Sequence, residues 1–447
     1  MKSPTVYKSQ GQLPTGWDCN VIFIANINSL FYGNEFETNI LRNEIGSIDT
    51  YGGRLVPFLN LLFDKSQNLL VLERTPDPKL LEYFKKDLKL NLPELYILSH
   101  DAYDKITNFQ QGYECKELKV LRDHPASHLD GYVTDSGLEN LAEKIQKSTI
   151  STSAGSRKGN NKLLLHEFLK QQNLPVFDTF IAEDNRAVQK HLPLLKKMGY
   201  SRAVVKAQIG ASGIGMVRMD LNLPREIPKY LFYEGACLVQ GWLDEEVPGI
   251  ERVGSPSIQI FVNHEGIYLW DITEQILSPE SVHEGNVSPP PYLVAMDEIW
   301  TELFRQAECA GRWLHSLGYR GTGSIDFLVV KRNKKNEVRI CEINARVTGA
   351  TYPSMLAKHF LPHGAWLMRN VRFSPTLNSG RIFDRLKKKN LLFCKSDKKG
   401  ILPINFNLDR KDRVCKGQFL ALANTHDEVV SLMDNFKYEN IGDFDRD

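Results

Sequence analysis

The chain has 447 residues, a length that allows two or three domains with a large core. Its 56 basic and 54 acidic residues give a formal net charge of +2, so no strong field favours nucleic acid or an anionic membrane as a partner. Seven scattered cysteines, none in a Cys-x-x-Cys pair, indicate reduced thiols rather than a disulfide framework or a zinc site. Because Met1–Pro4 lacks an apolar leader and no run of 18 apolar residues occurs, we expect a cytoplasmic protein.

Residues 20 to about 150 show the pattern of an α/β domain. Three short apolar runs are typical of buried strands, at residues 21–25, 69–72 and 95–98. A helix is expected at 78–88, where Asp77 is a favourable N-cap and Pro78 fits the first turn. Alternation of strands and helices predicts a mostly parallel sheet. This domain contains no phosphate-binding glycine pattern.

The middle of the chain continues to alternate. Residues 147–161 are small and polar, a composition that predicts a linker or a mobile loop. Apolar residues at helical spacing predict a helix from Lys162 to about Gln172, and a strand is expected to begin at Pro175. A further helix is expected at 300–317. The end of the chain predicts a small module, with strands at 400–404 and 419–423 and a helix at 427–437.

A strand at 203–208 carries Lys206 and runs into a glycine-rich loop between two strands. The candidate loop residues are Gly210, Ala211, Ser212, Gly213 and Gly215. Since no helix follows, the loop is neither a Walker A loop nor a dinucleotide turn. Such a loop can fold over a triphosphate like a flap, because backbone N–H groups approach phosphates closely where no Cβ intervenes. Lys206 would add a compact positive charge. The simpler alternative is a plain hairpin with a flexible tip.

The run 236–243 predicts a strand that ends in a purine hinge. The backbone groups expected to bond an adenine edge are those of Gln240, Gly241, Trp242 and Leu243. The acids that could reach ribose hydroxyls are Asp244, Glu245 and Glu246. The alternative interpretation is an ordinary solvated strand end.

Two short strands, at 321–330 and 338–346, carry paired carboxylates. The polar run between them, 331–337, predicts a hairpin loop. In an antiparallel pair of this register, Asp326 comes near Glu342.

Asn344 and Arg346 extend the same polar face, because side chains two apart in a strand point to the same side. Two carboxylates and an amide oxygen are hard ligands that suit Mg²⁺ together with substrate phosphates. Arg346 would lie where a transferred phosphoryl group or an acyl phosphate carries its charge. The alternative is a half-buried strand pair whose acids are simply solvated.

The order of these parts is similar to that of a known superfamily. Asn161-Lys162 at a helix start, Lys206 before the glycine loop, the hinge and the acidic strand pair resemble the ATP-grasp superfamily of carboxylate–amine ligases, over roughly residues 155–370. Within it, the chain most resembles the pheganomycin-type peptide ligases. That narrower likeness rests on the preceding α/β domain and on the runs at 273–277, 285–289, 346–353 and 400–403.

The resemblance implies a role for each matching position. Lys162 and Lys206 would bind the nucleotide, and residues 210–215 would form the phosphate flap. The implied ligands of two Mg²⁺ ions, which Mn²⁺ can replace, are Asp326, Glu342 and Asn344. Arg346 would steady the acyl phosphate, so Arg346 and Lys206 are the expected catalytic residues. The hinge departs from the pattern, because Gln240-Gly241-Trp242 stands where many relatives carry an acid followed by apolar residues.

An α/β (α+β) fold of four units is implied as well. They are a pre-ATP-grasp α/β domain at 1–150, an ATP-grasp N-terminal subdomain with the glycine flap at 151–245, a C-terminal metal and substrate subdomain at 246–375, and a small module at 376–447. The two subdomains would clasp ATP between them.

The implied reaction activates the carboxylate of an amino acid or peptide as an acyl phosphate. An amine then attacks, giving an amide, ADP and phosphate, in natural-product biosynthesis. The expected partners are small-molecule or peptide carboxylates and amines, without nucleic acid or membrane, and a homodimer stays open beside a monomer. Substrate contacts are expected from Gln275, His283, Arg320 and Gly349.

Several alternatives stay open. Arg252 and Arg320 both suit a substrate carboxylate, although we prefer to regard Arg252 as an ordinary surface residue. His283, in the turn-rich loop 278–291, is a candidate base for the amine. A phosphotransferase on the same fold would give a stable phosphorylated product without an amide. A non-catalytic nucleotide-binding protein would have no need of the complete acidic and basic set.

Overall fold

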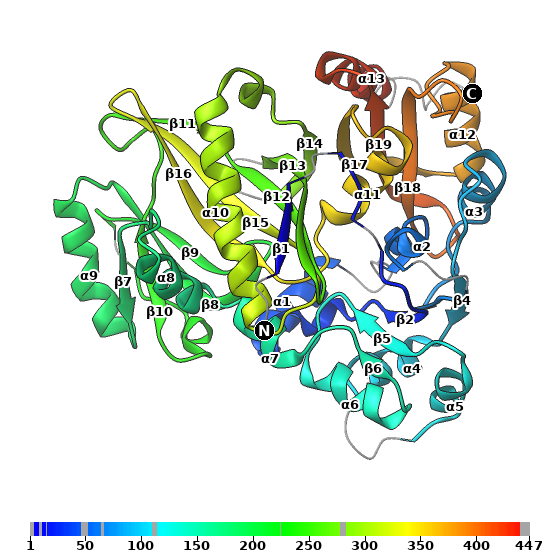
Figure 1. Ribbon diagram of the computed structural model, residues 1–447, viewed down its shortest axis with the longest axis horizontal. Coiled ribbons are helices and arrows are strands. Elements are labelled where there is room, and N and C mark those ends of the chain that lie inside the picture. Colours follow the sequence, from blue (N-terminus) through cyan, green and yellow to red (C-terminus); the bar gives the residue numbers. More distant parts are fainter. Residues whose placement is uncertain are drawn as a thin grey trace.

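Three β-sheets and the helices around them make up the computed structural model (Figure 1). It describes residues 4–8, 11–14, 16–45, 52–63, 67–109, 114–223, 225–277 and 283–438. A five-stranded sheet forms the N-terminal domain, a four-stranded sheet follows, and a ten-stranded sheet carries most of the remainder. This mixture confirms the predicted α/β (α+β) class. Within the described ranges, no helix has the length and apolar character needed to cross a bilayer.

The N-terminal domain has the parallel sheet that the sequence predicts, in the order β4-β3-β2-β5-β6. Its strands are β2 (Val21–Ile24), β3 (Leu69–Leu72), β4 (Glu94–Ile97), β5 (His128–Gly131) and β6 (Ser148–Thr149). Its helical segments are η1 (Ile27–Phe31), α1 (Glu35–Ile45), η2 (Gly52–Leu55), α2 (Leu59–Leu62), α3 (Pro78–Glu82) with the π-helical turn η3 (Tyr83–Asp87), α4 (His100–Thr107), α5 (Lys116–Asp123) and α6 (Ser136–Lys144). Asp77 caps α3 as predicted, because its side chain accepts a hydrogen bond from the Leu80 amide at 2.9 Å.

The expected linker at 147–161 is structured, so that prediction is wrong. Strand β6 and helix α7 (Ser153–Gly159) occupy it. The Thr152 side chain accepts a hydrogen bond from the Gly155 amide at 3.0 Å and so caps α7. A Cβ on Gly159 would lie 2.7 Å from Ala345 Cβ, so the small residues serve close packing rather than flexibility.

The four-stranded sheet, called the small sheet below, is antiparallel in the order β7-β10-β8-β9. Its strands are β7 (Thr179–Ala182), β8 (Arg202–Ala211), β9 (Ile214–Asp220) and β10 (Cys237–Gly241). Helices α8 (Lys162–Gln171) and α9 (Asn185–Lys197) pack on it, with η4 (Lys229–Phe232) before β10. The predicted helix from Lys162 is confirmed. The glycine-rich segment is shorter as a loop than expected, since β8 and β9 pair up to Ala211 and Ile214.

The ten-stranded sheet, called the large sheet, has the order β11-β15-β12-β13-β14-β17-β19-β18, with β16 beside β15 and β1 beside β13. Its strands are β1 (Thr5–Lys8), β11 (Ile250–Gly254), β12 (Pro256–Val262), β13 (Gly266–Leu277), β14 (His283–Ser288), β15 (Gly321–Arg332), β16 (Lys335–Asn344), β17 (Ala365–Leu377), β18 (Gly400–Leu408) and β19 (Val414–Ala423). The helical segments around it are η5 (Pro291–Ala295), α10 (Asp297–Ser316), α11 (Thr351–Phe360), α12 (Ser379–Lys388) and α13 (His426–Tyr438).

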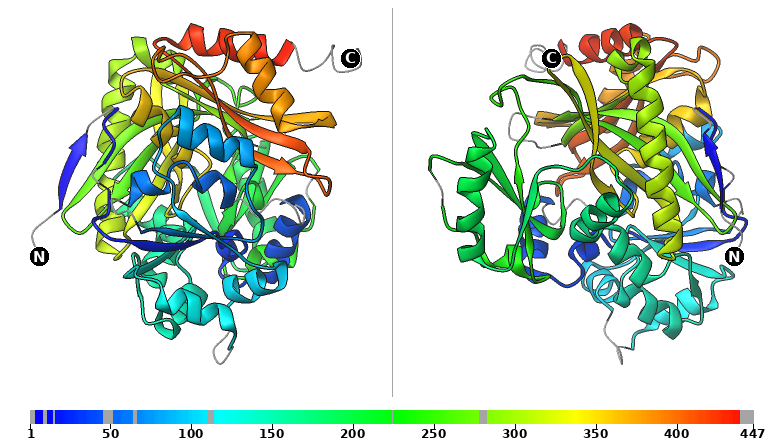
Figure 2. Two further views of the ribbon diagram at one scale, coloured as in Figure 1. Left: turned by 90° about the vertical axis from the view of Figure 1, so that its right-hand side faces the viewer. Right: turned by 60° about the vertical axis from the view of Figure 1, so that its left-hand side comes forward.

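The C-terminal strands β18 and β19 extend the large sheet beyond β17 instead of forming a sheet of their own. Their apolar side chains share one core with the N-terminal domain, where Leu55 and Phe58 lie in the same cluster as Ile401 and Leu402. Chain segments far apart in sequence therefore lie side by side, the blue N-terminal helices next to the orange C-terminal strands (Figure 2, left).

Strand pairing in the acidic hairpin of β15 and β16 extends further than expected. The predicted loop 331–337 reduces to a two-residue turn, Asn333-Lys334, with φ of 48° and 69°. Positive φ at both central positions is the geometry that matches the twist of paired strands. The polar flanking residues therefore stay in the ladder, because backbone hydrogen bonds do not require apolar side chains.

Candidate active site

A cavity of about 730 Å³ lies between the small sheet and the large sheet. It brings together most of the predicted nucleotide and substrate residues. Those that line it are Lys162, Lys206, Gly210, Ala211, Ser212, Gly213, Gly215, Gln240, Gly241, Trp242, Leu243, Gln275 and Glu342. These residues are spread along the sequence from Lys162 to Glu342, so their convergence is a property of the fold.

The two predicted carboxylates face each other across β15 and β16. Asp326 and Glu342 are directly opposed in the antiparallel register. The Asp326 carboxylate accepts hydrogen bonds from Ser257 Oγ at 2.6 Å and from Asn344 Nδ2 at 2.9 Å. Arg346 in turn donates to Asn344 Oδ1. Hydrogen bonds therefore connect Asp326, Asn344 and Arg346, and Glu342 lies opposite Asp326 in the strand pair.

The electrostatics of the acid pair differ between its members. Burial and the charge of Glu342 raise the pKa of Asp326 above its ordinary value. Burial also works to raise the pKa of Glu342, but the charges of Lys162, Lys206 and Arg346 outweigh it and hold that pKa low. Glu342 is thus charged and paired with Lys162, whereas the charge of Arg346 only partly offsets the effects that raise the pKa of Asp326.

Both predicted nucleotide lysines point to this region. Lys162 Nζ lies 3.1 Å from Glu342 Oε2 and donates to the Gly210 carbonyl at 3.2 Å, so it bridges the acid pair and the glycine loop. Lys206 Nζ lies 5.9 Å from the ring centre of Phe177. Burial lowers the pKa of Lys206, which indicates a cation that would gain from an anionic ligand.

The backbone of the glycine loop, residues 210–215, adopts a conformation that disfavours residues with a Cβ at its glycine positions. Gly213 and Gly215 have φ of +83° and +82°, and a Cβ on Gly210 would lie 2.6 Å from the Ile214 carbonyl oxygen. Backbone N–H groups at such positions remain open to phosphates.

At the hinge, residues 240–244 line the cavity, whereas the other two candidate acids, Glu245 and Glu246, are not among its lining residues. Gly241 is required there, because a Cβ would lie 2.4 Å from the Tyr200 ring. Arg218 lies over the Trp242 ring with its guanidinium carbon 5.1 Å from the ring centre. Glu246 instead accepts hydrogen bonds from Ser201 at 2.9 Å and Arg202 at 3.0 Å, while Asp244 lines the cavity.

The predicted substrate residues are dispersed. Gln275 lines the cavity, and so does Arg252, against the expectation of an ordinary surface arginine. Arg320 is used within its own turn, donating to the carbonyls of His315 and Tyr319 at 3.0 and 2.6 Å. Gly349 lies in the half-buried turn before α11, outside the cavity lining.

His283 begins β14, where its backbone pairs with Leu277. Within the predicted loop 278–291, residues 278–282 lie outside the described part of the chain.

Residues that sequence reasoning missed position the acid pair. Ser257, on β12, and Ser324, two residues before Asp326, both donate to Asp326 Oδ1. Ser324 shares a strand face with Asp326, so its spacing was a usable signal. Ser257 is 69 positions away, and only the pairing of β12 with β15 brings it near.

The donor set fits Mg²⁺. Within the described residues, no group of three or more His, Cys, Asp and Glu side chains gathers in a way that could hold a metal by itself. Two opposed carboxylates and an amide beside a large cavity match an ion that takes its other ligands from water and phosphates. Burial and the charge of Glu342 raise the pKa of Asp326, and a divalent cation would stabilise its charged form.

No family model matches the chain. A curated relative, the [butirosin acyl-carrier protein]–L-glutamate ligase of Niallia circulans, is 22% identical over 299 residues, a match that spans 65% of this chain and 64% of that protein. Among solved structures, N5-carboxyaminoimidazole synthetase from Staphylococcus aureus complexed with ADP superposes with a TM-score of 0.52 at 13% identity, over 97% of this chain and 100% of the other.

The biotin carboxylase domain of Hydrogenobacter thermophilus 2-oxoglutarate carboxylase, complexed with MgADP, gives a TM-score of 0.53 at 11% identity, over 93% of this chain and 88% of the other. The chain has the ATP-grasp fold. The ATP-grasp arrangement accounts for a cavity between two sheets, with the glycine loop on one wall and Glu342 of the acid pair on the other.

Proposed function

We propose that the protein is an ATP-dependent carboxylate–amine ligase. It would convert a carboxylate and ATP into an acyl phosphate and ADP, and then join the acyl group to an amine with release of phosphate. The observation that carries the proposal is the convergence, in and beside one cavity, of two lysines, a glycine loop and an opposed carboxylate pair.

Activation is needed because a carboxylate has no usable leaving group. Transfer of the terminal phosphoryl group of ATP to a carboxylate oxygen breaks the phosphorus–oxygen bond to ADP and forms an acyl phosphate. Attack by the amine nitrogen then expels phosphate, and the nitrogen loses a proton. ADP complexes of proteins with this fold support ATP as the nucleotide substrate.

Some residues of this chain would stabilise negative charge, and the glycine loop would shield the reacting groups from water. Lys206 and Lys162 would bind phosphate oxygens, and Arg346 would stabilise charge on the acyl phosphate. Asp326, Glu342 and Asn344 would hold Mg²⁺, which supplies charge neutralisation to the phosphates when it is bound. The glycine loop would exclude water, which otherwise hydrolyses an acyl phosphate.

For the substrates, we propose an amino acid or peptide carboxylate joined to an amine in natural-product biosynthesis. The curated relative carries L-glutamate and an acyl-carrier protein in its name, which supports an amino acid as one partner and a carrier-bound group as a candidate for the other. Arg252 on the cavity wall is a candidate contact for a substrate carboxylate.

Product analysis tests this function. The purified protein would be incubated with Mg·ATP and pooled amino acids, short peptides, small amines and an acyl-carrier protein, followed by mass spectrometry. ADP together with a new amide is the expected result. AMP with an amide would mean adenylation, and a phosphorylated product without an amide would mean a phosphotransferase; either result would refute the proposal.

A further inference from the structure

The two residues that flank the exposed turn Ser212-Gly213 of the glycine loop are packed against the N-terminal domain. Ala211 and Ile214, which face each other across the turn, are only 6% and 8% exposed. The other buried members of their hydrophobic cluster all come from the N-terminal domain: Leu30, Phe31, Leu41 and Val133. Loop tips in proteins are normally solvated and polar. The apolar residues here therefore have a partner surface.

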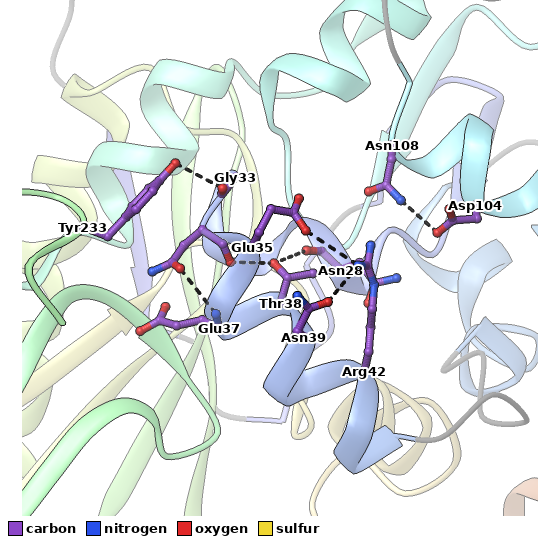
Figure 3. A network of polar contacts seen from close by, with 11 residues as sticks. Asn28, Gly33, Glu35, Glu37, Thr38, Asn39, Arg42, Asp104, Asn108 and Tyr233 are labelled. Atoms are coloured by element: carbon purple, nitrogen blue, oxygen red, sulfur yellow. Dashed lines mark hydrogen bonds and ion pairs between the residues drawn. The ribbon is translucent and has the colours of Figure 1, made fainter. Parts of the chain in front are cut away.

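A second contact joins the same two parts at a separate point. Phe36 in α1 stacks on Tyr230 of η4, with ring centres 4.6 Å apart and planes inclined by 16°. Tyr233 donates from its hydroxyl to the Gly33 carbonyl at 3.1 Å, just before α1 begins (Figure 3). The blue η1–α1 segment accordingly lies beside the green small sheet (Figure 2, right).

A third contact lies at the base of the loop. A Cβ on Gly215 would lie 2.9 Å from Glu37 Oε1. Glu37 is 1% exposed, and its Oε1 has no hydrogen-bond partner within the described residues. The Glu37 side chain thus lies close to the loop at position 215, where a φ of +82° also favours glycine.

We propose that residues 27–45 of the N-terminal domain hold the glycine loop in its closed position, with Leu30 and Ile214 as positioning residues for phosphoryl transfer. The proposal rests on the proposed function, because the loop is taken to cover ATP phosphates. A covering loop must stay shut during transfer, and one made of small residues has few contacts of its own. Through this docking the N-terminal domain would contribute to the reaction, although the lining residues of the cavity begin in sequence at Lys162, after that domain.

Amide hydrogen exchange in the nucleotide-free protein tests the docking. Leu30→Ala removes apolar contact to the loop from a different domain, so exchange at residues 207–216 should accelerate roughly tenfold or more. The matched control is Leu118→Ala, because Leu118 is buried in a cluster of the N-terminal domain that contains no loop residue. That control should leave exchange at 207–216 unchanged. Unchanged exchange in folded Leu30→Ala would overturn the proposal.

Phe36→Ser serves if Leu30→Ala does not fold. Phe36 is 58% exposed, so its replacement weakens the stack on Tyr230 without opening the core. Exchange at 207–216 should again accelerate, and its failure to do so would count against docking.

Turnover supplies a readout that a purely structural role would not change. Leu30→Ala and Ile214→Ala should each raise KM for ATP by about tenfold and increase ADP released per amide formed, because an open loop admits water. Their effects should be less than additive in the double variant, since both remove one contact. Additive effects would contradict docking. A wild-type protein with a protected loop but no ATP turnover would refute the proposed function while supporting the docking.

Discussion

At the scale of single residues, Glu342 is the link between the acid pair and the cavity. It is the member of the pair that lines the cavity, and Lys162 lies 3.1 Å from it. Its partner Asp326 is oriented by three neighbouring side chains, those of Ser257, Ser324 and Asn344. The two carboxylates are therefore held in place before any ligand arrives, which lowers the reorganisation needed for reaction.

Glu342→Gln should abolish most turnover while the fold remains. Because Glu342 would be a ligand of Mg²⁺, loss of its negative charge is expected to weaken metal binding and lower kcat by about 100-fold or more, measured as ADP and amide formation. Arg346→Ala should have a similar effect. The matched control is Glu251→Gln, since Glu251 is a 70% exposed side chain on the neighbouring β11. Full activity in Glu342→Gln would remove the basis for the metal assignment.

Glu37→Gln should stabilise the protein at alkaline pH. Burial and the nearby Glu234 raise the pKa of Glu37 from 4.5 to about 7, against the opposing charge of Lys162. The folded state thus favours the neutral acid, and stability falls as pH rises from about 4.5 through 7. The glutamine variant escapes this penalty, so its advantage in free energy of unfolding should grow to about 2 kcal/mol by pH 8.

Urea denaturation at pH 5 and pH 8 measures this difference. Glu35→Gln is the control on the same turn of α1, with a side chain that is 73% exposed. An advantage of Glu37→Gln that is equal at both pH values would show that Glu37 does not ionise against a penalty.

At the scale of elements, local chemistry explains where the segments begin and end. Helix α8 starts where Asn161 caps it, with the Asn161 side chain accepting from the Leu164 amide at 2.9 Å. The capping residue Thr152 likewise sets the start of α7 in a stretch whose composition suggests a linker. A polar composition alone is therefore a poor predictor of a linker where the small residues cap a helix or pack closely.

Thr152→Ala should destabilise the protein by about 1 kcal/mol, because the cap of α7 is lost. Ser148→Ala replaces an exposed hydroxyl in the same stretch and should change stability little. Equal stability of both variants in thermal denaturation would mean that the Thr152 hydrogen bond contributes nothing to folding.

At the scale of the whole molecule, the acidic hairpin, the glycine loop and the hinge could be predicted from the sequence. The residues that contact them from distant parts of the chain could not. Asp326 and Glu342 were predictable because they share a hairpin, where register follows from the short connection. The contribution of Ser257 depends on strands that pair across 69 residues, and the position of Glu246 depends on Arg202. No local pattern encodes such contacts.

The packing of the N-terminal domain against the rest of the molecule is the largest feature that could not be predicted from the sequence. Its apolar residues Leu30 and Phe31 look like ordinary core positions, yet they pack with Ala211 and Ile214, which flank the turn of a loop nearly two hundred residues away. Similarly, β18 and β19 join the large sheet and share a core with the N-terminal domain. The arrangement makes the ATP-grasp part dependent on both ends of the chain.

The most direct test of the account is the fate of carboxylate oxygen during ligation. With carboxyl groups labelled with oxygen-18, an acyl-phosphate route predicts transfer of one labelled oxygen into the released phosphate for each amide formed. Mass spectrometry of phosphate, ADP and AMP would show the destination. Label in AMP, or amide formation with no label in phosphate, would contradict phosphoryl transfer to the carboxylate at this site.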